Sequence, residues 1–135
     1  MIAAALLLLA LAGVAKSAVD ILTHQPDNNT LSARGGWFDA RLSWKLKYKD
    51  YDKGDLRPRF LGSKTWLVSL TDFWHAADAV YLLTYGGGNL LLGAAAVMLP
   101  FPLIKGLALF AVGRLLFGVC FEFFYQKVWR KRPVA

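Results

Sequence analysis

Hydrophobic residues are gathered in long blocks along this chain and are not spaced at the period of a half-buried helix or strand. The longest blocks cover residues 2–22, 65–85 and 103–124. Each is close to the roughly 20 residues that a helix needs to cross a hydrocarbon core about 30 Å thick. The pattern therefore predicts three transmembrane helices over these ranges.

A fourth apolar segment, residues 90–102, is too short to cross a membrane and contains Pro100 and Pro102. The uncharged sequence Gly-Gly-Gly-Asn at 86–89 precedes it and is typical of a tight turn. We expect 90–102 to be re-entrant or interfacial, or to form the outer part of a helix kinked at its prolines. The predicted fold class is all-α, with one integral membrane domain over residues 1–135.

The composition agrees with a membrane location and excludes sites that need several cysteines. The chain is 56% hydrophobic and has a mean hydropathy of +0.39, which is high for a soluble domain. Its single cysteine, Cys120, can build neither a disulfide framework nor a cysteine-based zinc site. Residues 13–15 resemble a signal-peptidase site, but no basic residue precedes the first block, so we expect an uncleaved span.

The basic residues indicate how the spans are oriented. The net charge is +7, and thirteen of the sixteen Lys and Arg residues lie in the 23–64 loop and the C-terminal tail. Cytoplasmic loops carry an excess of Lys and Arg, so both segments are predicted to be cytoplasmic. We expect a protein of the inner membrane with its N-terminus outside and its C-terminus in the cytoplasm.

Aromatic side chains alternate with the cations of the 23–64 loop, among them Trp37, Trp44 and Tyr48. This mixture suits a membrane interface, where rings lie among the headgroups and cations meet lipid phosphates. Nucleic-acid binding is the competing interpretation, and a loop tethered to spans at both ends disfavours it. The predicted partners are membrane lipids, with anionic headgroups at this loop; a homo-oligomer is an open alternative.

Two Asp/His pairs are placed where charged groups are costly in a membrane and often functional. Asp20 and His24 are four residues apart, and Asp72 and His75 are three apart, so each pair shares one helix face. We expect His75 to reach Asp20, His24 or Arg114 of another span. The four Asp and His residues could ligate a divalent metal such as zinc. They could also form a metal-free acid–base site with His75 as the base.

Several cations are candidates for binding phosphate beside that site. Arg114 would supply a fixed positive charge from the third span. The sequence Gly-Ser-Lys-Thr at 62–65 opens the second predicted span, with Ser63 as its N-cap. Backbone N–H groups at such a helix start, together with Arg59 and Lys64, would make an anion site.

Four stretches carry a resemblance to known sequences: the Asp20-x-x-x-His24 pair, SWKLKY at 43–48, PRFLGSKTWLVSLTDFWH at 58–75 and GRLLFGVCFEFFY at 113–125. Together they resemble a family of small, functionally uncharacterised multi-pass membrane proteins of bacteria. The resemblance implies several spans and no particular reaction. It draws attention to Asp20, His24, Trp44, Lys45, Arg59, Ser63, Thr65, Asp72, His75 and Arg114, and it adds Lys45 to the candidate substrate-binding cations.

The leading functional hypothesis is a membrane-embedded site that faces the cytoplasmic leaflet and binds or processes a phospholipid or a similar phosphate-bearing amphipath. Such an enzyme would be a metal-dependent or acid–base hydrolase or transferase. A structural or accessory membrane protein, in which Asp72–Arg114 and Lys16–Asp20 are ion pairs that only stabilise the helices, is the first alternative. Ligation of haem by the two histidines, or proton conduction along the spans, is the second.

Overall fold

Three long helices form the body of the protein in the computed structural model, which describes residues 1–131. They are α1 (Ile2–His24), α3 (Phe73–Val97) and α4 (Pro102–Phe123), and the π-helical segment η6 (Phe124–Trp129) continues α4. All three are long and apolar enough to cross a membrane. The structure thus agrees with the predicted number of spans and with a mostly helical fold.

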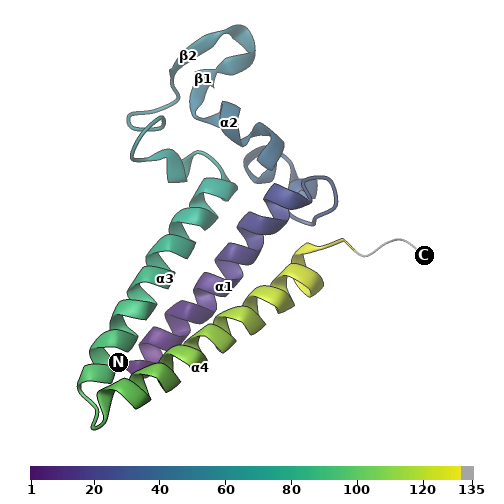
Figure 1. The fold of residues 1–135 in the computed structure, drawn as a ribbon. Coiled ribbons are helices and arrows are strands. Elements are labelled where there is room, and N and C mark those ends of the chain that lie inside the picture. The colour runs from purple at the N-terminus through teal and green to yellow at the C-terminus, as the bar shows by residue number, and fades with distance from the viewer. Residues whose placement is uncertain (132–135) are drawn as a thin grey trace.

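Short elements fill the segment between α1 and α3. They are η1 (Ser32–Arg34), η2 (Gly36–Phe38), η3 (Ala40–Leu42), α2 (Ser43–Leu46), β1 (Tyr48–Asp50), η4 (Tyr51–Lys53), β2 (Asp55–Pro58) and η5 (Val68–Leu70). Strands β1 and β2 pair as an antiparallel hairpin that projects beyond the helix ends (Figure 1). The predicted loop at 23–64 is therefore folded, and the chain is not purely α-helical.

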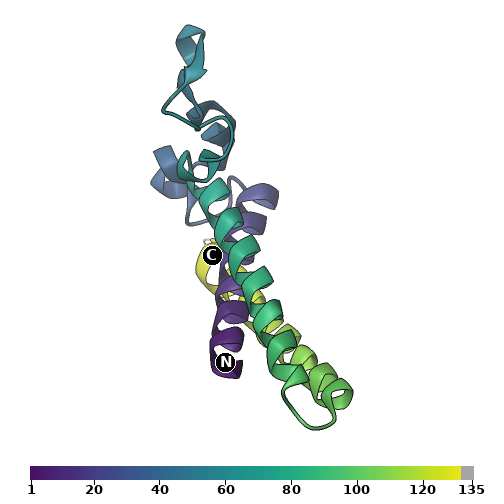
Figure 2. The ribbon, with the colours of Figure 1, turned by 90° about the vertical axis from the view of Figure 1, so that its left-hand side faces the viewer.

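Helix α1 packs on both other helices and lies between them in the view of Figure 1, and Figure 2 shows α1 to one side of α3. In the most apolar stretch of each helix, 44% of the residues are buried in α1, against 17% in α3 and 6% in the span that contains α4. Small residues allow the close approach. A Cβ added at Gly13 would lie 2.4 Å from the Phe117 carbonyl oxygen, and one at Gly88 would lie 2.8 Å from Leu9 Cγ.

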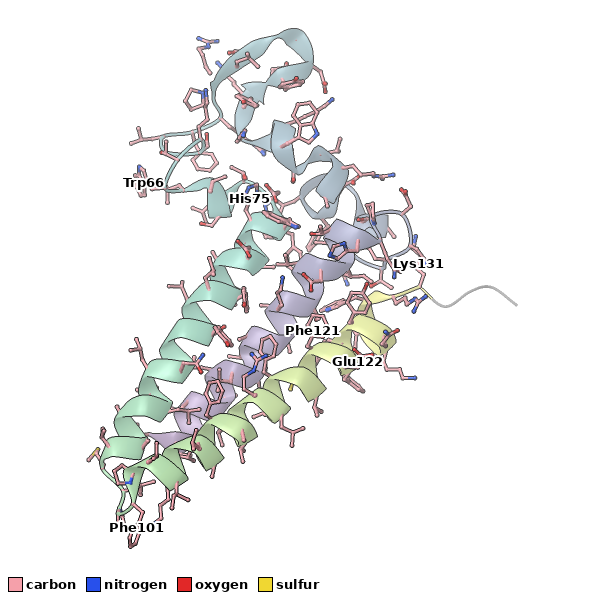
Figure 3. The ribbon with its side chains drawn as sticks, viewed as in Figure 1. Trp66, His75, Phe101, Phe121, Glu122 and Lys131 are labelled. Carbon is pink, nitrogen blue, oxygen red and sulfur yellow. The ribbon has the colours of Figure 1, made fainter. Side chains whose placement is uncertain are left out.

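The two basic segments lie at the same end of the helices, as the predicted topology requires. The N-terminus and the turn at Phe101 lie at the opposite end (Figures 1 and 3). The end of η6 is tied to the α1–α3 segment by a hydrogen bond from Thr30 N to Trp129 O at 2.8 Å. In the same region, Trp129 Nε1 donates to Ser17 Oγ at 3.0 Å. Which end faces the cytoplasm stays a prediction.

The interpretation of residues 86–89 as a turn is wrong. They continue α3, which runs on to Val97, so residues 90–97 are not a separate short segment. Glycine disfavours helix by about 1 kcal/mol per residue, but Gly88 is buried against α1, where any larger residue would clash. The chain reverses instead at 98–101, and Pro102 stands in the first turn of α4, where its missing N–H costs nothing.

The second span also begins later than predicted. Residues 65–71 form turns and η5, and α3 starts after Asp72, whose side chain caps it. Ser63 is not an N-cap: it is fully buried, and its hydroxyl donates to Lys47 O at 2.8 Å. Because no helix starts at 62–65, the predicted anion site at that position is not formed.

The close contact at Gly13 gives a prediction about packing. The Gly13→Ala variant forces α1 and α4 apart, and we expect it to lower the free energy of unfolding in detergent by about 1–3 kcal/mol, measured by denaturant titration. Gly118→Ala is the matched control, because a Cβ at Gly118 meets nothing within 4 Å. Equal stability of the two variants would contradict the packing of α1 on α4.

Candidate functional site

The Asp72 carboxylate is the centre of a small buried hydrogen-bond network. It is 1% exposed and accepts from His75 N at 3.0 Å through Oδ1. Its Oδ2 accepts from the Thr71 hydroxyl at 2.8 Å and lies 2.6 Å from His75 Nδ1. One residue therefore caps α3 and orients the imidazole, because a carboxylate at Nδ1 favours the tautomer with the proton there. Nε2 is then left as a proton acceptor.

His75 lines a pocket of about 450 Å³ at the ends of α1 and α3, beneath the segment that contains α2 (Figure 3). Its side chain is 25% exposed, so the ring is accessible from the pocket while Asp72 behind it is not. Trp74 Nε1 donates to Thr23 Oγ1 at 2.9 Å and ties the two helix ends together. The pocket is lined by Leu22, Thr23, Pro26, Ala40, Arg41, Ser43, Trp44, Lys47, Trp74 and His75.

Two cations line this pocket, and they differ in how their charge is compensated. Arg41 contacts both oxygens of Asp39, each at 2.8 Å, and Asp27 at 2.9 Å. These hydrogen bonds from Arg41 hold the pKa of the Asp39 carboxyl below its usual range. Lys47 lies over the Tyr48 ring at 5.4 Å and has no carboxylate within ion-pair distance in residues 1–131. Lys47 is therefore the lining residue whose cation has no carboxylate partner among the described residues.

The predicted meeting of His75 with the other spans does not occur. Asp20 pairs instead with Lys16, one turn earlier on α1, at 2.6 Å. His24, the last residue of α1, is exposed and does not line the pocket. No hydrogen bond joins His75 to Asp20, His24 or Arg114 within the part of the chain that the structure describes, so that expectation is wrong.

The four residues proposed as metal ligands do not converge. No group of three or more His, Cys, Asp or Glu side chains that could hold a metal ion occurs in residues 1–131. Each oxygen of Asp72 already accepts a hydrogen bond from a neighbouring residue. The structure does not form the predicted metal site of Asp20, His24, Asp72 and His75. It does form the local contact between Asp72 and His75.

The predicted phosphate-binding cations lie elsewhere. Arg114 Nη1 donates to the Tyr85 hydroxyl at 3.1 Å, far along α3 from Asp72. Lys45 pairs with Asp52. Lys64 lies over the Tyr48 ring at 5.1 Å, and the backbone N–H of Arg59 donates to Lys47 O at 3.0 Å, so both belong to the base of the hairpin. None of the four lines the pocket.

Sequence reasoning missed the two cations that do line the pocket. Arg41 follows Asp39 by two residues, a spacing at which a capping carboxylate can hold the side chain. Lys47 lies inside the SWKLKY string that carried the resemblance. Comparison with known protein families, with curated proteins and with solved structures finds no match, so the functional interpretation rests on this geometry.

Proposed function

We propose that the His75 pocket binds the headgroup of a phospholipid or similar phosphate-bearing amphipath at the cytoplasmic surface of the inner membrane. The observation that carries the proposal is the contact of the buried Asp72 with the half-buried His75, which lines a pocket together with Lys47 and Arg41. The pocket lies at the ends of two helices that have the length of membrane spans. In a bilayer, the ends of such helices would lie at the level of the lipid headgroups. Trp44 and Trp74 offer apolar walls to the rest of the amphipath.

The chemistry that fits this pocket is metal-free acid–base catalysis. Lys47 attracts the phosphate, since its charge has no carboxylate partner. His75 Nε2 accepts the proton of a water or alcohol whose oxygen attacks the phosphorus atom of the bound headgroup, and Asp72 stabilises the imidazolium that forms. The bond from phosphorus to the departing ester oxygen breaks, and the imidazolium returns its proton to that oxygen. The reaction class is hydrolysis or group transfer on a lipid.

A structural role without catalysis is the second candidate, and specific contacts favour it. Asp72 is an N-cap whatever else it does, and hydrogen bonds from Trp74 and Trp129 tie α1 to the rest of the bundle. In an accessory protein the carboxylate would matter as a cap, and the imidazole would matter little. The two roles therefore predict different results for substitutions in the Asp72–His75 pair.

Lipid binding should depend on the charge of Lys47. We expect Lys47→Gln to weaken binding of phosphatidylglycerol to the detergent-purified protein about tenfold, or about 1.4 kcal/mol, as measured by native mass spectrometry. Lys49→Gln is the matched control, because Lys49 lies two residues away and does not line the pocket. Equal loss in both variants would show a diffuse attraction to the basic loop in place of a headgroup pocket.

Substitutions at Asp72 and His75 should affect lipid turnover and protein stability differently. We expect Asp72→Asn to keep most of the stability, because Asn caps helices as well as Asp does, while Asp72→Ala costs about 1–2 kcal/mol. Asp72→Asn and His75→Gln should both abolish turnover of vesicle lipids, followed by mass spectrometry of lipid extracts. Wild-type protein that turns over no lipid, together with stability that follows the cap alone, would favour the structural role.

The proposed orientation is open to cysteine labelling. In a Cys120→Ser background, we expect a cysteine at Leu99, in the α3–α4 turn, to react with a membrane-impermeant maleimide on intact cells. A cysteine at Lys53, at the hairpin tip, should react only after permeabilisation. The reverse pattern would place the His75 pocket on the outer surface.

A further inference from the structure

A second polar locus lies on the α3–α4 side of the bundle, well away from His75. Arg114 is near the middle of the Pro102–Trp129 span, and its side chain is exposed. It donates one hydrogen bond, to Tyr85, and lies over the Tyr85 and Phe117 rings at 5.8 and 5.1 Å. No carboxylate lies within ion-pair distance of it in residues 1–131. A guanidinium has five N–H donors, so most of its capacity is unused.

A cavity of about 510 Å³ lies between the second half of α3 and the first half of α4; Arg114 does not line it, but Phe110, one helical turn before Arg114, does. Tyr85, the hydrogen-bond partner of Arg114, lines one end of it. The rest of the lining is Asn89, Leu92, Gly93, Ala96, Gly106 and Phe110, of which Gly93, Ala96 and Gly106 are small enough to let a neighbouring helix come close. Small residues of this kind permit close helix packing in membranes, where charged groups pair with one another or face a protein interior.

We propose that this cavity is the docking site of a transmembrane helix from a different protein, and that a carboxylate near the middle of that helix pairs with Arg114. Charge complementarity selects the occupant: an uncompensated guanidinium at mid-span requires an anion at the same depth. A lipid phosphate lies at the membrane surface, whereas an Asp or Glu of a neighbouring helix can lie at this level.

A second copy of this chain does not meet the requirement. Copies that share one orientation in a membrane place Arg114 beside groups of its own depth. Glu122 lies about 12 Å along α4 towards the hairpin end. Asp78 lies about 10 Å from Tyr85 in the same direction, and Asp20 is already paired with Lys16. The partner is therefore a separate chain.

The test uses a synthetic 22-residue Leu/Ala helix with a central Asp, compared with the same helix carrying Leu there. Binding to the full-length protein is measured by energy transfer in phosphatidylcholine vesicles at pH 8. We expect the Asp helix to bind at least tenfold more tightly than the Leu helix. Arg114→Gln should remove that difference. Gly93→Leu places a side chain in the open space of the cavity and should weaken the binding of both synthetic helices.

Matched variants make the outcomes unambiguous. Lys105→Gln removes a neighbouring cation of α4, and Gly118→Leu enlarges another open glycine outside the cavity, so neither should change binding. Equal affinity of the two helices for the wild type would overturn the proposal. Self-association lost in Arg114→Gln, or displacement of the Asp helix by phosphatidylglycerol, would overturn it in favour of a second copy or a lipid.

The partner site and the headgroup pocket share only the insertion of α4 and its neighbours into a membrane. Lys47→Gln should leave binding of the Asp helix unchanged, and Arg114→Gln should leave phosphatidylglycerol binding unchanged. The two proposals can therefore be contradicted independently of each other.

Discussion

The candidate site depends on the hydrogen bonds of the buried Asp72 carboxylate. It ends the irregular segment, begins α3 and fixes the imidazole of His75, all with two oxygen atoms. The first N–H groups of a helix lack partners within the helix, and here a side chain supplies one. Moving the start of α3 by one residue would separate the cap from the ring. The position of His75 in the pocket is thus a consequence of where the helix begins.

The surroundings of Asp72 also explain why a charged group is tolerated there. Its carboxylate receives hydrogen bonds from Thr71 and from the backbone of His75, and its second oxygen contacts the ring. A buried acceptor that is fully satisfied avoids the penalty of desolvation without compensation. The charge of Arg41, which lines the pocket, is likewise compensated, because Arg41 forms ion pairs with Asp39 and Asp27. Lys47 has no such partner among the described residues, and the proposed headgroup site uses this difference.

Local patterns in the sequence predicted the features that depend on near neighbours. Three apolar blocks gave three long helices, and the three-residue spacing of Asp72 and His75 gave their contact. Asp20 has two candidate partners at four-residue spacing, Lys16 and His24, and the structure pairs it with Lys16, which offers a full charge. Where two partners have equal spacing, the periodicity of a helix does not choose between them.

Features that depend on distant contacts could not be predicted in this way. Gly86–Gly88 is turn-like in isolation, and only the packing of Gly88 against Leu9 of α1 explains why it stays helical. Arg41 and Lys47 reach the pocket because α2 folds back over the ends of α1 and α3, an arrangement that no local spacing encodes.

The two polar loci differ in the one respect that decides what each can bind. With the helices inserted as proposed, water and headgroups at the helix ends would screen charge, and an unpaired Lys47 would be inexpensive to keep. Near the middle of a span, an Arg costs about 2.5–3.5 kcal/mol on insertion scales, and aromatic faces at 5.1 and 5.8 Å recover only part of that. A cation that is inexpensive to keep suits a ligand that exchanges, such as a lipid headgroup. A costly one suits a partner that stays bound, because its release would expose the guanidinium to hydrocarbon again.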